Sequence, residues 1–508
     1  MTSTSDEVPD APQASPPLPG WVAATVTFLS SGAVLVMEIV GLRLIAPYVG
    51  VTLQTSTAVI GFALAAIALG AWTGGAVADR VDPRRLIAPL MVAGGALVIA
   101  VLPLVRFTGS LVSGADAGAV LLLAAVAVVV PAALLSAVPP MVVKLQLSNL
   151  DETGAVVGRL SGIGTLGAIA ATFVTGFLLI AVLPSSVILV GTGVVTVAVG
   201  VALGVMLQRV SGHGRAPAAL VVLAVAGSLL AALAPTPCEE ETAYHCARVE
   251  ADPERDSGRV LRLDTLRHSY VDLADPTHLE FEYVRAIAAV SDVLRPEGEP
   301  LSALHLGGGG LTLPRYLAEV RPGTRSRVIE VDPGVVRIDR EQLGLETSDR
   351  LQVTVADGRV GLGEEPAGER DLVVGDAFGG LAVPWQLTTR EAVELVDRAL
   401  ADDGVYAINL IDHPPLGFVR AELATLRAVF PHVALLARIP VLAGEDGGNL
   451  VAVASRSPIP ADALAERLTD HDLIWRVAQG TDLDRFIGDA DVLTDDHAPV
   501  DQLLTPYG

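Results

Sequence analysis

The feature that most constrains the fold is a series of apolar runs in the first half of the chain. Before residue 236, stretches of about 20 residues almost free of charge recur, and charged residues are confined to the gaps between them. A helix of about 20 apolar residues crosses a bilayer core. We therefore expect a transmembrane helical bundle over residues 21–235. Its spans, about seven in number, are expected at 21–43, 56–78, 86–105, 117–138, 161–183, 185–207 and 217–235.

The segment before the first span is rich in Pro and Ser, so residues 1–20 are predicted to be disordered. The first span lacks the basic region of a cleaved signal peptide, and further spans follow it. We therefore interpret it as a signal anchor. Glycines at four-residue spacing, such as Gly70 and Gly74, permit close helix contact in lipid and favour a compact bundle.

The second half of the chain has the charge distribution of a soluble domain. After a linker at 236–256 that contains two cysteines, strand-like and helix-like segments alternate, which is typical of a doubly wound parallel sheet. A hairpin is expected at 257–290, ahead of a nucleoside-binding domain at 291–508. Strands are predicted in the segments LSALHL, SRVIEVD, LQVTVAD, RDLVVGDAF, GVYAINLID, HVALLARIP and NLVAVASR.

A glycine-rich loop and a set of acids mark the candidate site. Four glycines, Gly307 to Gly310, follow the first strand of the sheet and let the backbone approach a ligand closely. Glu330 follows the loop at about the spacing of a carboxylate that accepts ribose hydroxyls. Further acids lie at strand ends, where the ligand of such a sheet binds: one ends the same strand as Glu330, and the others end the next three strands. They are Asp332, Asp357, Asp376 and Asp412. The pattern favours an adenosine ligand over a dinucleotide.

The ordered motifs resemble the spermidine synthases, in particular their membrane-fused relatives. The resemblance covers roughly residues 257 to 460 and implies a Rossmann-like, class I methyltransferase-type domain. HLGGGG is similar to the family's glycine loop, VIEVD to its ribose-binding strand with Glu330 and Asp332, and VADGR to its adenine-side strand with Asp357 and Gly358. VVGDAF is similar to the strand with the catalytic aspartate, here Asp376. VLRLD, His268 and Tyr283 are similar to the substrate hairpin.

The resemblance also implies a reaction. An amine attacks the methylene beside the sulfonium of decarboxylated S-adenosylmethionine, and 5'-methylthioadenosine leaves as a neutral thioether. Asp376 would act as general base, Glu330 would hold the ribose and Asp357 the adenine side. The implied partners are this nucleoside, an amine and membrane lipid, with no metal. A homodimer is left open.

Three departures from the family fall on the acceptor side of the site. Gly310 replaces an acid that holds the aminopropyl ammonium, and Gly379 replaces a second acid after Asp376. Val284 and Arg285 follow Tyr283 where the family has His and Glu. Arg285 would repel a diamine and could pair with a carboxylate. Two alternatives therefore stay open: lyase-type cleavage of intact S-adenosylmethionine without an external amine, and a non-catalytic nucleoside sensor.

Charge and composition exclude other classes. A formal net charge of −23, with Lys144 as the single lysine, leaves no basic surface for nucleic acid. The nine histidines have no metal-ligand spacing, and we interpret His305 as a packed core residue.

The distribution of basic residues predicts the side of the soluble domain. The loops after the second, fourth and sixth spans carry Arg80, Arg84, Arg85, Lys144, Arg159, Arg209 and Arg215, against Arg43 and Arg106 on the opposite side. Because positive residues stay inside, an odd span count places the soluble domain outside the cytoplasm. Cys238 and Cys246 could close a small disulfide loop there. The cytoplasmic origin of S-adenosylmethionine argues the other way.

Overall fold

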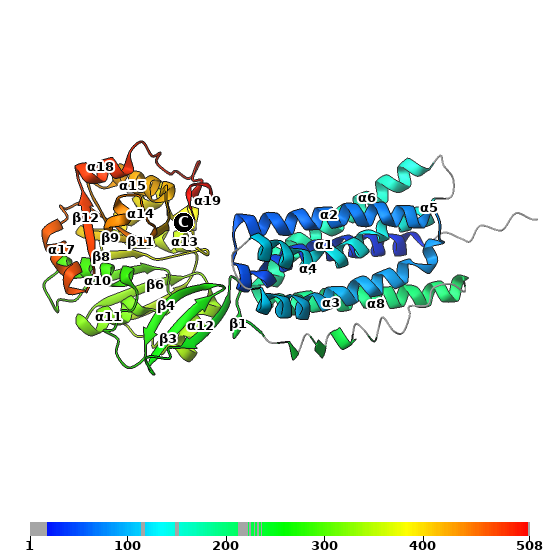
Figure 1. Cartoon of the computed structure of the whole chain (residues 1–508), viewed down its shortest axis with the longest axis horizontal. Helices are drawn as coiled ribbons and strands as arrows, with labels where there is room; N and C mark the ends of the chain where they lie inside the picture. Colours follow the sequence, from blue (N-terminus) through cyan, green and yellow to red (C-terminus); the bar gives the residue numbers. More distant parts are fainter. Residues whose placement is uncertain are drawn as a thin grey trace, which may run out of the picture. The chain divides into compact units, whose positions relative to one another are not determined.

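The chain forms two compact units, Met1–Pro237 and Cys238–Gly508, which we describe separately (Figure 1). The computed structural model describes residues 18–112, 117–147, 152–211, 222, 225–227, 229–230, 233–234 and 236–505. Most of the predicted disordered segment at 1–20 and most of the predicted seventh span at 217–235 lie outside these residues.

The first unit is a bundle of long apolar helices. Within the described residues, 6 helical segments are long and apolar enough to cross a membrane: Gly20–Val49, Leu53–Ala78, Pro83–Leu111, Ala117–Gln146, Thr153–Val182 and Ser185–Arg209. They contain α1 (Gly20–Val49), α2 (Leu53–Ala78), η1 (Pro83–Arg85), α3 (Ile87–Leu111), α4 (Ala117–Ser136), α5 (Val138–Gln146), α6 (Thr153–Phe173), η2 (Val174–Leu179), α7 (Ile180–Val182) and α8 (Ser185–Ser211). Each segment overlaps one of the first six predicted spans.

Small residues allow these helices to pack backbone against backbone. A Cβ added at Gly70 of α2 would lie 2.2 Å from the carbonyl oxygen of Ala133 in α4. One added at Gly167 of α6 would lie 2.3 Å from the carbonyl oxygen of Phe28 in α1. Since neither distance is sterically permitted, glycine is needed for these two helix pairs to approach so closely.

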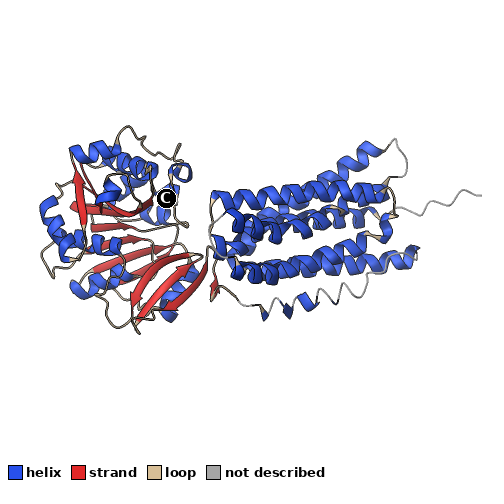
Figure 2. Ribbon diagram, viewed as in Figure 1, coloured by secondary structure: helices blue, strands red, loops and turns tan. Residues whose placement is uncertain are grey.

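The second unit is built on an eight-stranded sheet with the order β12-β10-β11-β9-β8-β5-β6-β7. Figure 2 draws the strands in red. The strands are β5 (Ser302–Leu306), β6 (Arg325–Glu330), β7 (Leu351–Val355), β8 (Arg370–Gly375), β9 (Leu400–Asp412), β10 (His432–Arg438), β11 (Gly448–Ser455) and β12 (Trp475–Gln479). The strands from β7 to β9 in this order are parallel, while β10, β11 and β12 are added antiparallel. The seven predicted strands are present, and β12 is one that the sequence did not indicate.

Helices cover both faces of the sheet. The remaining elements are α10 (Glu282–Leu294), α11 (Thr312–Val320), α12 (Pro333–Gln342), α13 (Gly358–Gly363), η3 (Trp385–Leu387), α14 (Arg390–Ala399), α15 (Gly417–Val429), α16 (Ile439–Leu442), α17 (Ala461–Asp470), α18 (Thr481–Ile487) and α19 (Val500–Leu503). One apolar core joins the strands to α14 and α15, and a second joins the opposite face to α10, α11 and α17. The strand ends that carry the candidate residues are therefore fixed from both sides.

A four-stranded antiparallel sheet precedes the large sheet along the chain. It consists of β1 (Glu240–Glu241), β2 (Cys246–Ala251), β3 (Gly258–Leu263) and β4 (Leu266–Asp272). Residues 236–256, predicted as a linker, thus contribute β1 and β2 to a folded sheet. Cys238 and Cys246 are joined by a disulfide, with their Cα atoms 5.1 Å apart.

Candidate active site

The glycine loop packs directly on the carboxyl ends of the neighbouring strands. Gly307 and Gly310 have positive φ angles of 100° and 75°, which favour glycine. A Cβ at Gly307 would lie 2.2 Å from the carbonyl oxygen of Asp376. The backbone N–H of Gly308 donates to Oε2 of Glu330 at 2.7 Å. The loop and the strand-end acids therefore form one tightly packed unit.

Glu330 is held at the end of β6 by two backbone donors. Its Oε2 accepts from Gly308, and its Oε1 accepts from the N–H of Asp332 at 2.8 Å. The side chain is buried, which raises the pKa of Glu330, while the two N–H groups act in the opposite direction. Each carboxylate oxygen keeps a second lone pair, which can accept a hydrogen bond from a hydroxyl group of a ligand.

Three other strand-end acids are helix caps. Asp332 accepts the N–H of Gly334 at the start of α12, and Asp357 accepts the N–H groups of Arg359 and Val360 at the start of α13. Asp412 accepts the N–H groups of Phe418 and Val419 in α15. Since Ser, Thr, Asp and Asn stabilise helix N-termini in this way, these carboxylates have a structural task of their own.

Asp376 differs from these acids because its carboxylate accepts hydrogen bonds from side chains and not from the backbone of a helix start. Oδ2 accepts from the hydroxyl of Tyr283 at 3.1 Å, and Oδ1 accepts from the amide of Asn409 at 2.9 Å. Asn409 in turn accepts from the amide of Asn449 at 2.9 Å. Burial raises the pKa of Asp376 to about 6 against the opposing effect of Asn409 and Tyr283. The carboxylate is thus ionised at neutral pH and is more basic than an ordinary aspartate.

A pocket lies between the glycine loop, the hairpin and α10. Asp376, Tyr283 and the glycine loop line it together with residues of the hairpin and of α11. The full lining is His268, Ser269, Tyr270, Glu280, Phe281, Tyr283, Val284, Ile287, His305, Gly307, Gly308, Gly309, Leu311, Thr312, Leu313, Pro314, Val374 and Asp376. Within the described part of the chain, no cluster of three or more His, Cys, Asp or Glu side chains is arranged to hold a metal.

The hairpin fills the space beside the last two glycines of the loop. A Cβ at Gly309 would lie 2.6 Å from Cδ2 of His268, and one at Gly310 would lie 2.2 Å from Oγ of Ser269. Burial, together with His245, lowers the pKa of His268 to about 4, so its imidazole is neutral at pH 7. The place that an acid at position 310 would take is therefore lined by uncharged groups.

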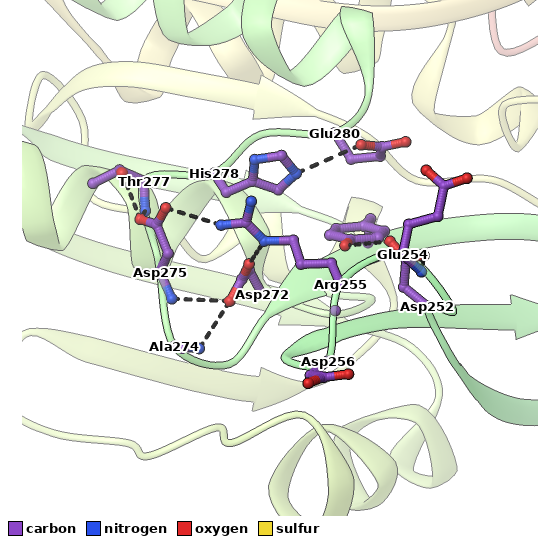
Figure 3. Close-up of polar contacts among 12 residues, drawn as sticks. Asp252, Glu254, Arg255, Asp256, Asp272, Ala274, Asp275, Thr277, His278 and Glu280 are labelled. Carbon is purple, nitrogen blue, oxygen red and sulfur yellow. Dashed lines mark hydrogen bonds and ion pairs between the residues drawn. The ribbon is translucent and has the colours of Figure 1, made fainter.

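The turn after β4 is fixed by a polar network, shown in Figure 3. Arg255 forms ion pairs with Asp272 and Asp275, and Asp272 also accepts the N–H groups of Ala274 and Asp275. Farther along the turn, His278 lies 3.5 Å from Glu280. This network holds the segment that brings Glu280 to the pocket.

Several sequence-predicted residues lie elsewhere. Arg285 donates to the carbonyl oxygen of His471 and is not among the residues that line the pocket, so its pairing with a ligand carboxylate stays a prediction. Tyr283 and Arg285 both lie in α10, where a spacing of two residues points side chains in different directions. A Cβ at Gly358 would approach Leu387 at 3.3 Å, and one at Gly379 would meet nothing within 4 Å.

Three residues of the site were not predicted from the sequence. Asn409 could have been noticed as a polar residue inside an apolar strand. Asp339, whose Oδ1 accepts the N–H of Gly310 at 3.0 Å, lies in an ordinary helical pattern and gave no signal. His305 was interpreted as core; it is buried, but it also lines the pocket. Its Nε2 and Oγ of Ser269 have no hydrogen-bond partner among the described residues.

The second unit is similar to known transferases. No family model matches the chain. A polyamine aminopropyltransferase of Vibrio vulnificus is 30% identical over 206 residues, which cover 37% of this chain and 63% of that protein. An eEF1A lysine and N-terminal methyltransferase of Bos taurus is 30% identical over 171 residues, which cover 31% of this chain and 24% of that protein. The chain thus spans less than two thirds of the length of these relatives.

Among solved structures, a probable spermidine synthase from Corynebacterium glutamicum shares 30% identity with this chain. The match covers 50% of this chain and 95% of that one, with a TM-score of 0.48. The similarity in sequence to aminopropyltransferases agrees with the order of motifs, from the glycine loop to Glu330 and Asp376. The α/β unit of this chain is therefore spermidine synthase-like in sequence.

Proposed function

We propose that the α/β unit is a transferase that acts on a sulfonium nucleoside and is anchored in the cell membrane by the helical bundle. The substrate is decarboxylated S-adenosylmethionine or S-adenosylmethionine, and the product is 5'-methylthioadenosine, released by aminopropyl-type transfer. The similarity to polyamine aminopropyltransferases supports the reaction class. The 6 long apolar helices support the anchor.

The environment of Asp376 is the main support for this proposal. The carboxylates of Asp332, Asp357 and Asp412 accept backbone N–H groups at helix starts, whereas Asp376 presents its carboxylate to a pocket. Its pKa of about 6 suits a general base, which works best when its pKa is near the operating pH. A protein that only binds a nucleoside has no use for such a base.

The proposed transfer is a nucleophilic substitution at carbon. The lone pair of a neutral amine attacks the methylene carbon beside the sulfonium, and the carbon–sulfur bond breaks. Its electron pair moves to sulfur, which leaves as the neutral thioether of 5'-methylthioadenosine. The new ammonium group loses a proton to the carboxylate of Asp376. Glu330 and the glycine loop hold the nucleoside in place during this step.

One observation favours a second candidate, the lyase-type cleavage of intact S-adenosylmethionine. Ser269 and the neutral His268 line the space where the family has an acid. The carboxylate of intact S-adenosylmethionine is therefore not repelled there. In this variant a carboxylate oxygen of the substrate attacks its own methylene carbon, and the thioether leaves without an external amine.

Product analysis separates these candidates. The purified full-length protein is incubated with S-adenosylmethionine, or with the decarboxylated form plus diamines, and the products are identified by mass spectrometry. An aminopropylated amine with 5'-methylthioadenosine supports transfer. Methylthioadenosine formed from S-adenosylmethionine without an amine supports the lyase. Nucleoside binding without any methylthioadenosine would overturn both and leave a sensor.

We predict that Asp376→Asn abolishes amine-dependent turnover and leaves nucleoside binding nearly intact, because the amide keeps the shape and loses the base. A loss of about 10²-fold or more is expected for a general base. Asp402→Asn, at a fully exposed position, is the matched control and should keep the wild-type rate. Survival of the amine-dependent rate in Asp376→Asn would remove Asp376 from the role of base.

We predict that Glu330→Ala weakens the binding of 5'-methylthioadenosine by roughly tenfold or more, the scale of a lost charge-assisted hydrogen bond. Isothermal titration calorimetry measures this change, and thermal unfolding without ligand reports whether the loop stays folded. Glu346→Ala, at an exposed position in the same unit, is the control. An unchanged affinity in a folded Glu330→Ala variant would contradict the nucleoside assignment.

A further inference from the structure

The disulfide loop, residues 238–246, is attached to the helix that follows the ribose-binding strand. The hydroxyl of Thr242 donates to Oδ2 of Asp332, the residue that caps α12. Glu240 forms an ion pair with Arg337 of α12. A Cβ at Gly334 would lie 2.4 Å from Cγ2 of Thr242, so the loop packs closely on the start of the helix.

Tyr244 lies at the tip of this loop. Its N–H donates to Oγ1 of Thr242 at 3.1 Å, which ties the tyrosine to the contact with Asp332. Its side chain is 50% exposed, although large aromatic side chains are usually more buried. Burial of its hydroxyl raises the pKa of Tyr244, and the carboxylates of Asp332, Asp357 and Glu330 raise it further. Through Thr242, the loop that carries Tyr244 contacts Asp332 at the end of β6, and Glu330 accepts the N–H of Asp332.

We propose that Tyr244 is a contact residue of the nucleoside site. Its ring covers the purine nucleoside that Glu330 binds, and the Cys238–Cys246 disulfide positions the ring. This inference rests on the proposed function, because it takes Glu330 as the ribose ligand. The exposed ring, the Thr242–Asp332 contact and the closed loop carry it.

The same surroundings define the class of ligand. The carboxylates of Asp332 and Glu330 lie beside the loop that carries the ring, and they favour an uncharged or positively charged nucleoside over a phosphorylated one. An aromatic ring stacks on a purine regardless of what the 5' position carries. The site should thus bind 5'-methylthioadenosine and reject adenosine 5'-monophosphate, which differs mainly in its 5' charge.

Calorimetry on the oxidised full-length protein in detergent tests the contact, with 5'-methylthioadenosine as ligand. We expect Tyr244→Ala to weaken binding about tenfold, the scale of a lost aromatic–base stack. Tyr244→Phe keeps the ring and should stay within about twofold of the wild type. Ile474→Ala removes a more exposed apolar side chain beside β12, at the opposite edge of the sheet from β7, and should bind normally. Wild-type affinity in Tyr244→Ala would overturn the proposal.

Reduction of the disulfide tests the positioning. In the wild type, reduction should lower the affinity toward the Tyr244→Ala value, with mass spectrometry confirming two free thiols. In Tyr244→Ala, the same reduction should change the affinity little, because the ring is already absent. Unchanged wild-type affinity after full reduction would overturn the role of the disulfide.

The failure of this inference is distinguishable from the failure of the proposed function. If the wild-type protein does not bind 5'-methylthioadenosine, or Glu330→Ala binds as well as the wild type, the nucleoside assignment itself is wrong. If Glu330→Ala weakens binding and Tyr244→Ala does not, only the contact by Tyr244 is wrong. Tight binding of adenosine 5'-monophosphate would contradict the ligand class.

Discussion

At the scale of single residues, the environment of Asp376 sets the pH range in which the proposed base can work. Burial raises its pKa to about 6, and the hydrogen bonds from Asn409 and Tyr283 lower it. A base must be ionised to accept a proton, so the rate of methylthioadenosine release should rise with pH through about 6 and then level off.

We predict that Asn409→Ala moves this rise to higher pH. The variant removes a donor that stabilises the ionised form, so the pKa of Asp376 increases, by roughly one unit for a single hydrogen bond of this kind. The pH dependence of the turnover rate measures the change. Asn449→Ala leaves the Asn409–Asp376 bond in place and should shift the midpoint less. A midpoint that stays fixed or moves to lower pH in Asn409→Ala would contradict the assignment.

The acids at the strand ends could be predicted from the sequence, but the hydrogen bonds that each carboxylate forms could not. Glu330 and Asp376 could be located because a parallel sheet brings its carboxyl ends to one edge. That Asp332, Asp357 and Asp412 cap helices depends on the geometry of the loops that follow them. That Arg285 lies in α10 and donates to the carbonyl oxygen of His471 could not be derived from a short motif.

Among the helices and strands, the long and strongly apolar segments could be predicted from the sequence, and the short polar ones could not. The six long apolar helices and seven strands of the large sheet could be predicted because each is a long or strongly apolar run. β12, with the sequence WRVAQ, is short, carries an arginine and lies at the edge of the sheet. β1 and β2 were taken for a linker because their strands are polar and pair mainly with one another and with β3.

We predict that Gly70→Ala destabilises the bundle and that Gly75→Ala does not. The added Cβ at Gly70 would lie 2.2 Å from the carbonyl oxygen of Ala133, so α2 and α4 would have to separate. Overpacking of this kind costs about 1–3 kcal/mol. At Gly75, on the same helix, an added Cβ meets nothing within 4 Å. Thermal unfolding in detergent should therefore show a lower midpoint for Gly70→Ala alone; equal midpoints would refute the close α2–α4 contact.

At the scale of the whole molecule, each unit has its own apolar core. The largest cluster of the first unit contains residues only from the helical bundle, and those of the second unit contain only sheet-domain residues. The distribution of basic residues predicts that the second unit lies outside the cytoplasm, where a disulfide such as Cys238–Cys246 is expected to form.

We predict that a membrane-impermeant maleimide labels Cys238 and Cys246 in intact cells only after reduction. A disulfide blocks both thiols, and a location outside the cytoplasm makes them reachable once they are reduced. A Cys238→Ser, Cys246→Ser double variant should give no label under any condition, because the chain has no other cysteine. Labelling that requires broken cells would place the α/β unit in the cytoplasm.

The contact between Ser269 and Gly310 has an evolutionary consequence. A single mutation of Gly310 to aspartate would bring its Cβ to 2.2 Å from Oγ of Ser269, in a backbone conformation with a positive φ angle. The positive φ angle strains such a mutation whatever residue stands at 269, and the clash with Ser269 adds to this strain. The cost of a mutation at 310 therefore depends on the residue at 269. A lineage with Ser269 and Gly310 would gain an acid at position 310 at a lower cost if the residue at 269 became smaller first.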